Sequence, residues 1–81
     1  MQPPHQIRLE YTVEPLSDDT SDPVTDAARH AVEGSGLTPE HGGPGTVLQG
    51  PSGLVSRTAA EVVRSAMDAG ADAVSLLVSR G

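Results

Sequence analysis

Several residue types are missing or scarce in this chain of 81 residues. It contains no cysteine, lysine, asparagine, phenylalanine or tryptophan, and Tyr11 is its single aromatic residue. Without cysteine the chain can form neither a disulfide framework nor a thiolate metal site. Without lysine it cannot form the Gly-Lys-Ser/Thr turn of a phosphate-binding P-loop. The core must be built almost entirely from aliphatic side chains.

Positive charge is also scarce, because five arginines stand against eleven acidic residues and leave a net charge of -6. Nucleic-acid binding draws its affinity from clustered Lys and Arg, whereas these arginines are scattered from Arg8 to Arg80. We therefore expect no nucleic-acid partner. The field of an acidic surface favours cationic ligands over anionic ones.

Long hydrophobic runs are missing as well. No stretch approaches the ~20 apolar residues that a membrane span needs. Residues 1–6 lack the basic and apolar regions of a signal peptide. The sequence thus predicts a cytoplasmic protein without a membrane partner.

The length of the chain predicts a single domain over residues 7–81, preceded by a flexible N-terminus over residues 1–6. Apolar and polar residues alternate from Ile7 to Glu14, which is the period-two pattern of a half-buried strand. This alternation puts Tyr11 on the core side of the strand.

A helix follows, and its two ends are marked by residue type. Asp22 and Pro23 predict the N-cap and the first helical position. Gly34 and Gly36 predict its end, because glycine adopts the left-handed conformation without a Cβ clash.

The glycine-rich middle of the chain predicts two short strands over residues 37–41 and 46–49, joined by a reversal at residues 42–45. A second helix is expected to begin at Ser52 or Ser56 and to stop at Gly70. Its buried stripe is predicted to be Val55, Ala59, Val62, Val63, Ala66 and Met67.

The last segment, residues 73–79, is a nearly continuous apolar run that predicts a strand buried on much of both sides. The resulting order is βαββαβ, which is typical of an α+β ferredoxin-like sandwich with a four-stranded antiparallel sheet and two helices on one face. The other sheet face has no cover within the chain. We therefore expect self-association, as a homodimer or homotetramer.

No residue pattern predicts catalysis or a resident cofactor. The three histidines, His5, His30 and His41, do not have the spacing of a metal-ligand motif. A nucleophile elbow of the G-x-S-x-G type does not occur. The glycines of residues 42–50 follow a helix and precede a strand, which is the reverse of a dinucleotide fingerprint. We expect a protein that is not an enzyme and holds no metal.

Three segments together resemble a known family. Ser35-Gly36-Leu37 is followed by Gly45-Thr46-x-x-Gln49-Gly50, residues 7–16 end in Glu-Pro-Leu, and residues 70–80 lead from Gly-Ala through an apolar strand to Arg. Over nearly the whole chain this is similar to the thiamine-binding protein family, whose signature is SGL followed by PMGT-x-x-EG. The resemblance implies a ferredoxin-like fold, binding of thiamine or its hydroxymethylpyrimidine moiety, and dimers that pair into tetramers.

The candidate ligand-binding residues come from two sources. The resemblance implies Thr46 and Gln49, framed by Gly45 and Gly50, and a loop serine at Ser21 or one position before it. The alternation of the first strand adds Glu10 and Thr12, because with Arg8 they face the open side of the sheet. The predicted site therefore comprises Glu10, Thr12, Ser21, Gly45, Thr46 and Gln49.

Two departures from the family pattern keep other functions open. Gln49 stands where the family usually has Glu, which removes a negative charge, and Pro44 replaces a methionine. The alternatives are a regulatory module of the amino-acid-sensing kind that binds another metabolite, and a structural oligomer that has lost its ligand. An acylphosphatase-type enzyme would need an asparagine, which the chain lacks.

Overall fold

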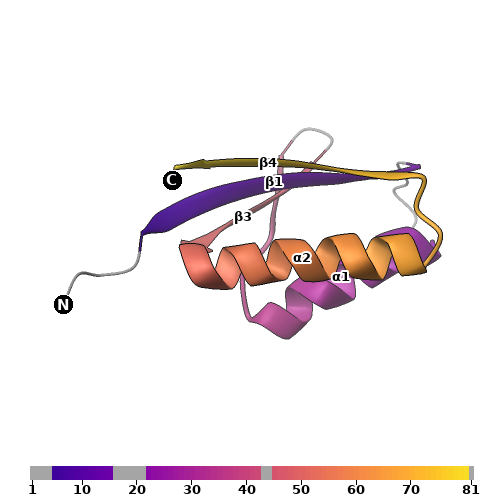
Figure 1. Cartoon of the computed structure of the whole chain (residues 1–81), viewed down its shortest axis with the longest axis horizontal. Helices are drawn as coiled ribbons and strands as arrows, with labels where there is room; N and C mark the ends of the chain where they lie inside the picture. Colours follow the sequence, from indigo (N-terminus) through magenta and orange to yellow (C-terminus); the bar gives the residue numbers. More distant parts are fainter. Residues whose placement is uncertain (1–4, 16–21, 43–44, 81) are drawn as a thin grey trace.

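The computed structural model describes residues 5–15, 22–42 and 45–80. Its elements are β1 (Gln6–Glu14), α1 (Pro23–Ser35), β2 (Glu40–Gly42), β3 (Gly45–Pro51), α2 (Ser52–Asp68) and β4 (Ala73–Arg80). The strands form one antiparallel sheet in the order β2-β3-β1-β4, and both helices lie against the same face (Figure 1). The predicted ferredoxin-like βαββαβ sandwich is confirmed.

The core lies between the two central strands and the helices. Leu9, Tyr11 and Val13 of β1 are buried there, and Leu9 lies directly opposite the equally buried Leu48 of β3. The alternation predicted for β1 is confirmed, because the residues between these three are only half-buried and point to the other face. Tyr11 is 6% exposed, so its predicted place in the core is also confirmed.

Helix α1 begins and ends where the sequence predicts. The Asp22 carboxylate accepts hydrogen bonds from the backbone N–H groups of Val24 (3.0 Å) and Thr25 (3.1 Å), which satisfies two of the unpaired donors at the helix start. At the other end Gly36 adopts a left-handed conformation with φ 81°. Both ends of the helix were thus predicted correctly from residue type alone.

Helix α2 follows β3 without a connecting residue, since Pro51 is both the last residue of β3 and the N-cap of α2. The backbone N–H of Ser52 donates to the His5 carbonyl oxygen at 2.8 Å, which ties the start of α2 to the chain just before β1. The earlier of the two predicted helix starts is therefore correct. Within the predicted flexible N-terminus, Gln6 begins β1 and residues 1–4 lie outside the described part of the chain.

The buried side of α2 differs from its predicted stripe at three positions, of which one is Val63, which is only half-buried and lies outside the core. Thr58 is buried and its hydroxyl donates to the Leu54 carbonyl oxygen at 2.8 Å, so the helix itself satisfies this polar group. Met67 was predicted to be buried and is 48% exposed. It lies in the last turn of α2, where the neighbouring Ala66 and the following Ala71 already fill the core.

The two short strands also differ from their predicted bounds. β3 is longer than residues 46–49, and β2 covers Glu40–Gly42 instead of residues 37–41. Leu37 packs against the core, and a Cβ added at Gly50 would lie 2.9 Å from Leu37 Cδ2. The segment before β2 therefore contributes a core side chain and does not pair with β3.

The prediction that the last strand is buried on both sides is wrong. β4 is an edge strand, and Leu76, Leu77 and Val78 are 42%, 60% and 55% exposed. A continuous apolar run predicts cover on both faces, but the helices of this chain do not cover this edge of the sheet.

No helix in the described residues is both long and apolar enough to cross a bilayer.

Candidate functional site

The sheet face opposite the helices, here called the open face, carries one row of side chains that crosses all strands. The register aligns Glu40 of β2, Val47 of β3, Glu10 of β1 and Leu77 of β4. Val47 is 6% exposed although it does not belong to the helix-side core. Two carboxylates thus flank a buried aliphatic side chain, and Leu77 extends the apolar surface on the far side of Glu10.

Gly45 makes room for the Glu10 side chain on this face. A Cβ built at Gly45 would lie 3.1 Å from both Cγ and Oε2 of Glu10 and 3.2 Å from the Tyr11 carbonyl oxygen. Contacts this short are tighter than ordinary van der Waals packing, so any larger residue would push against the carboxylate. The glycine therefore does more than permit the preceding reversal, because its missing side chain is the space that Glu10 occupies.

Arg8 and Gln49 complete the surroundings of this carboxylate. Nη1 of Arg8 lies 3.5 Å from Oε1 of Glu10, and the two side chains are 36% and 31% exposed. Arg8 lies directly opposite Gln49 in the β1–β3 ladder, at the distance of neighbouring cross-strand side chains. We call Arg8, Glu10, Gly45, Val47 and Gln49 the Glu10 cluster. It brings together a partly buried carboxylate, a cation, an amide and an apolar floor.

The structure divides the predicted site residues between the two faces of the sheet. Glu10, Thr12, Gly45 and Gln49 lie on the open face, whereas Thr46 lies opposite Tyr11 on the side covered by the helices. The cause is the period of a strand: residues 46 and 49 are three positions apart, an odd step, and must point to opposite faces. Ser21 lies outside the described residues.

The Thr46 side chain affects the buried hydroxyl of Tyr11. Burial raises the pKa of the Tyr11 hydroxyl above its ordinary value of 10.0, and a hydrogen bond with the Thr46 side chain offsets part of that rise. A buried hydroxyl without such a partner would cost ~1–3 kcal/mol. Because Tyr11 is buried on the side of the helices, the only aromatic ring of the chain is not available as a stacking surface on the open face.

Three members of this surface were not among the predicted site residues. Arg8 was predicted to lie on the open face, from its i, i+2 spacing to Glu10 on a strand, but it was not counted among the ligand-binding residues. Val47 and Leu77 flank Glu10 only because of the β3–β1–β4 register. Sequence pattern does not give that register, so these two neighbours needed the structure.

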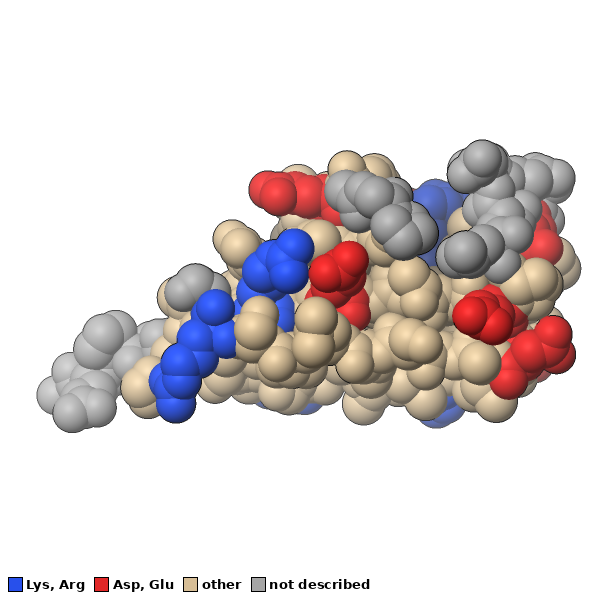
Figure 2. Space-filling model, turned by 90° about the horizontal axis from the view of Figure 1, so that it is seen from above, with Lys and Arg blue, Asp and Glu red and all other residues tan. Residues whose placement is uncertain are grey.

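Charge is distributed unevenly over the open face. Figure 2 views the molecule from this side and shows large uncharged areas, basic side chains toward the end that holds the C-terminus, and acidic side chains both in that half and at the opposite end. One acidic group lies directly beside a basic group, the arrangement that Arg8 and Glu10 have. A ligand on this face would meet an apolar surface with a few localised charges.

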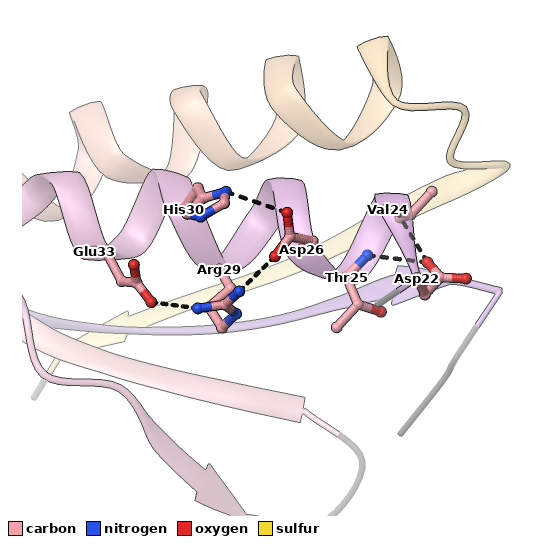
Figure 3. A network of polar contacts seen from close by, with 7 residues as sticks. All are labelled: Asp22, Val24, Thr25, Asp26, Arg29, His30 and Glu33. Carbon is pink, nitrogen blue, oxygen red and sulfur yellow. Dashed lines mark hydrogen bonds and ion pairs between the residues drawn. The ribbon is translucent and has the colours of Figure 1, made fainter. Parts of the chain in front are cut away.

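The outer side of the helices carries a depression. It runs between α1 and α2 and is lined by the polar side chains of His30, Ser35, Arg57 and Glu61, among others. His30 is paired with Asp26 at 3.3 Å, and Asp26 and Glu33 both pair with Arg29 (Figure 3). Within the described ranges no group of three or more His, Asp and Glu side chains is placed to hold a metal ion. The described side chains that line this depression therefore do not indicate a metal site.

Comparison with known proteins places this geometry among structures of the same fold. No protein-family profile matches the sequence, and no curated protein matches it. The chain is 26% identical to a domain of unknown function, DUF77, from Bacillus cereus, with a TM-score of 0.67 over 93% of this chain and 73% of that one. It is 22% identical to protein SP2199 from Streptococcus pneumoniae, with a TM-score of 0.70 over 94% and 84% of the two chains.

A third similar structure carries a functional description. It comes from Thermotoga maritima and is provisionally described as a thiamine biosynthesis or salvage protein. That protein is 20% identical to this chain, with a TM-score of 0.64 over 91% of this chain and 80% of its own. The likenesses show a shared fold. The neighbours therefore include both a domain of unknown function and a protein linked to thiamine.

Proposed function

We propose that this protein binds thiamine or its hydroxymethylpyrimidine moiety on the open face, at the Glu10 cluster, and that it does so without catalysing a reaction. The observation that carries the proposal is the Glu10 carboxylate, partly buried and held over Gly45 beside the apolar side chain of Val47. A carboxylate kept partly out of water attracts a cation more strongly than one on an exposed surface.

The other members of the cluster match what such a ligand requires. The aminopyrimidine ring carries hydrogen-bond donors and acceptors, and the Gln49 amide supplies both kinds of partner. Leu77, which is exposed and lies beside Glu10 in the same row, provides an apolar surface for a ring. The Glu10 carboxylate accepts a hydrogen bond from the amino group of the pyrimidine, or it lies opposite the positively charged thiazolium ring. The Thermotoga maritima neighbour linked to thiamine supports this choice of ligand.

A ligand cation that binds Glu10 must compete with the Arg8 guanidinium. Arg8 is 3.5 Å from Glu10, and a partly exposed pair at that distance contributes only ~0–1 kcal/mol. The pair is therefore weak enough for a ligand cation to compete with the guanidinium. Gln49, where the resembled family has Glu, keeps the hydrogen bonds and removes one charge, so we expect weaker binding of cationic ligands than in proteins with the acid.

Calorimetric titration of the purified protein with thiamine, hydroxymethylpyrimidine and thiamine phosphates tests the proposal. Glu10→Gln removes the charge and keeps the shape, and it is expected to weaken thiamine binding at least ~10-fold, since one charge-assisted hydrogen bond contributes about 1.5–3 kcal/mol. Gln49→Ala is expected to weaken binding of thiamine and of the uncharged pyrimidine alike.

Glu40→Gln is the matched control, because Glu40 lies in the same row and is exposed. It removes the same charge on the other side of Val47 from Glu10 and is expected to leave affinity within about twofold. Equal losses for both glutamate variants would mean that only the overall charge matters. If none of these compounds binds the unchanged protein, the proposal is wrong, and the alternatives of another metabolite or a purely structural role take its place.

A further inference from the structure

The outer edge of β4 is the largest uncovered apolar feature of the described chain. β4 pairs with β1 along its whole length from Ala73 to Arg80, and no strand lies on its other side in the described sheet. Leu77 projects from the open face, and Leu76 and Val78 project from the side of the helices. All three are exposed. A covering partner must therefore bury both faces of this edge.

This edge also lacks the usual protection against pairing. Natural edge strands are commonly short, charged, bulged or interrupted by proline. The opposite edge of the sheet, β2, is protected in this way because it has only three residues. β4 has eight residues, and residues 73–79 include no charged residue, proline or glycine. It is a complete, unprotected template for another strand.

The sequence of β4 is complementary to itself. Residues 75–79 read Ser-Leu-Leu-Val-Ser, which is symmetric in side-chain character about Leu77. If two copies align antiparallel with Leu77 opposite Leu77, each Leu76 lies opposite a Val78 and each Ser75 opposite a Ser79. Residues directly opposite each other share a sheet face, so apolar side chains meet apolar ones on both faces and the hydroxyls meet each other.

We propose that two copies of this chain associate through β4, antiparallel, with a two-fold axis at Leu77, and form one continuous sheet across the dimer. A two-fold axis perpendicular to the sheet brings the same patch of both copies together, as a closed symmetric interface requires. The helices of both copies then lie on the same side, and the two Glu10 clusters lie on the same open face, each separated from the axis by its own Leu77. The proposal does not depend on the ligand proposed above.

The charges at the two ends of β4 fit this arrangement. Arg80 ends the strand and Asp72 directly precedes it. Antiparallel pairing about Leu77 places Arg80 of one copy opposite Val74 of the other and diagonal to its Asp72, within reach of long side chains. A parallel arrangement would instead bring like charges together.

Single cysteines test both the edge and the register, because the chain has no native cysteine. Leu77→Cys is expected to form a covalent dimer on mild oxidation, since residues directly opposite have Cα atoms about 4.5–5.5 Å apart, within the range of a disulfide. Ser75→Cys alone and Ser79→Cys alone are expected to stay uncross-linked, because each lies ~13 Å along the strand from its own copy. An equal mixture of these two variants is expected to form mixed dimers.

The same variants can overturn the proposal. Cross-linking of Leu76→Cys or Val78→Cys to itself, without that of Leu77→Cys, would show a different register. Sedimentation of the unchanged protein as a monomer at hundreds of micromolar would exclude the dimer altogether.

A charge variant provides the check in solution. Leu77→Lys places two positive charges directly opposite each other and is expected to raise the dimer dissociation constant at least ~100-fold. Ala60→Lys adds the same charge on the exposed outer side of α2 and is expected to leave the dimer unchanged. If Leu77→Lys sediments like the unchanged protein, β4 is not the interface.

Discussion

Tyr11 and Glu10 are neighbours in sequence and meet opposite environments, because consecutive strand residues point to opposite faces of the sheet. Tyr11 is buried among aliphatic side chains and lies opposite Thr46 on the side of the helices. Glu10 lies over Gly45 on the open face and pairs weakly with Arg8. The only aromatic ring of the chain therefore belongs to the core, whereas the candidate binding site depends on the Glu10 carboxylate.

Tyr11 makes the stability of the fold sensitive to alkaline pH. Its pKa is raised in the folded state by burial, so folding favours the protonated form and this contribution is complete below the unfolded pKa of 10.0. It is lost as pH rises above that value through the higher folded pKa. Urea unfolding between about pH 8 and about pH 11 is expected to show a falling free energy of unfolding above pH 10.

The matched variant is Tyr11→Phe, which keeps the ring and removes the ionisation. Because the chain has neither lysine nor cysteine, no other side-chain type titrates near pH 10. The alkaline loss of stability is therefore expected to disappear in this variant. If the free energy of unfolding of Tyr11→Phe falls with pH as steeply as that of the unchanged protein, the alkaline loss of stability comes from another part of the molecule.

At the scale of elements, the sequence predicted helix ends better than strand environments. Asp22 and Gly36 mark the ends of α1 because capping is a local interaction between a side chain or a glycine and the adjacent backbone. The exposure of β4 is not local, since it depends on which strand lies beside it. The same distinction applies to the candidate site: Glu10, Gly45 and Gln49 were predicted from motif and alternation, whereas Val47 and Leu77 join them only through register.

The two glycines at the end of α1 are expected to respond in opposite ways to alanine. Gly34 is helical and a Cβ there would meet nothing within 4 Å, so Gly34→Ala is expected to raise the free energy of unfolding by ~0.5–1 kcal/mol. Gly36 has φ +81°, so Gly36→Ala forces a left-handed conformation and is expected to lower it by about 1 kcal/mol. Denaturant unfolding of both variants checks this pair, and shifts of the same sign would contradict it.

The whole molecule is a two-layer sandwich whose two sheet faces differ. One face is sealed by α1 and α2 and holds the core, while the other carries the Glu10 cluster and leads to the exposed edge at β4 (Figure 1). The chain shares this fold with its structural neighbours. The open face is where a chain with this fold can vary its chemistry without rebuilding its core.

The junction at Pro51, which ends β3 and caps α2, limits how the length of this chain can change. One inserted residue there would turn every α2 side chain by about 100° or move each β3 residue to the other face of the sheet. An alanine inserted after Pro51 is expected to abolish cooperative unfolding in circular dichroism. The same insertion after the exposed Thr38, between α1 and β2, is expected to be tolerated. Length variation among relatives should therefore collect before β2 and be absent between β3 and α2.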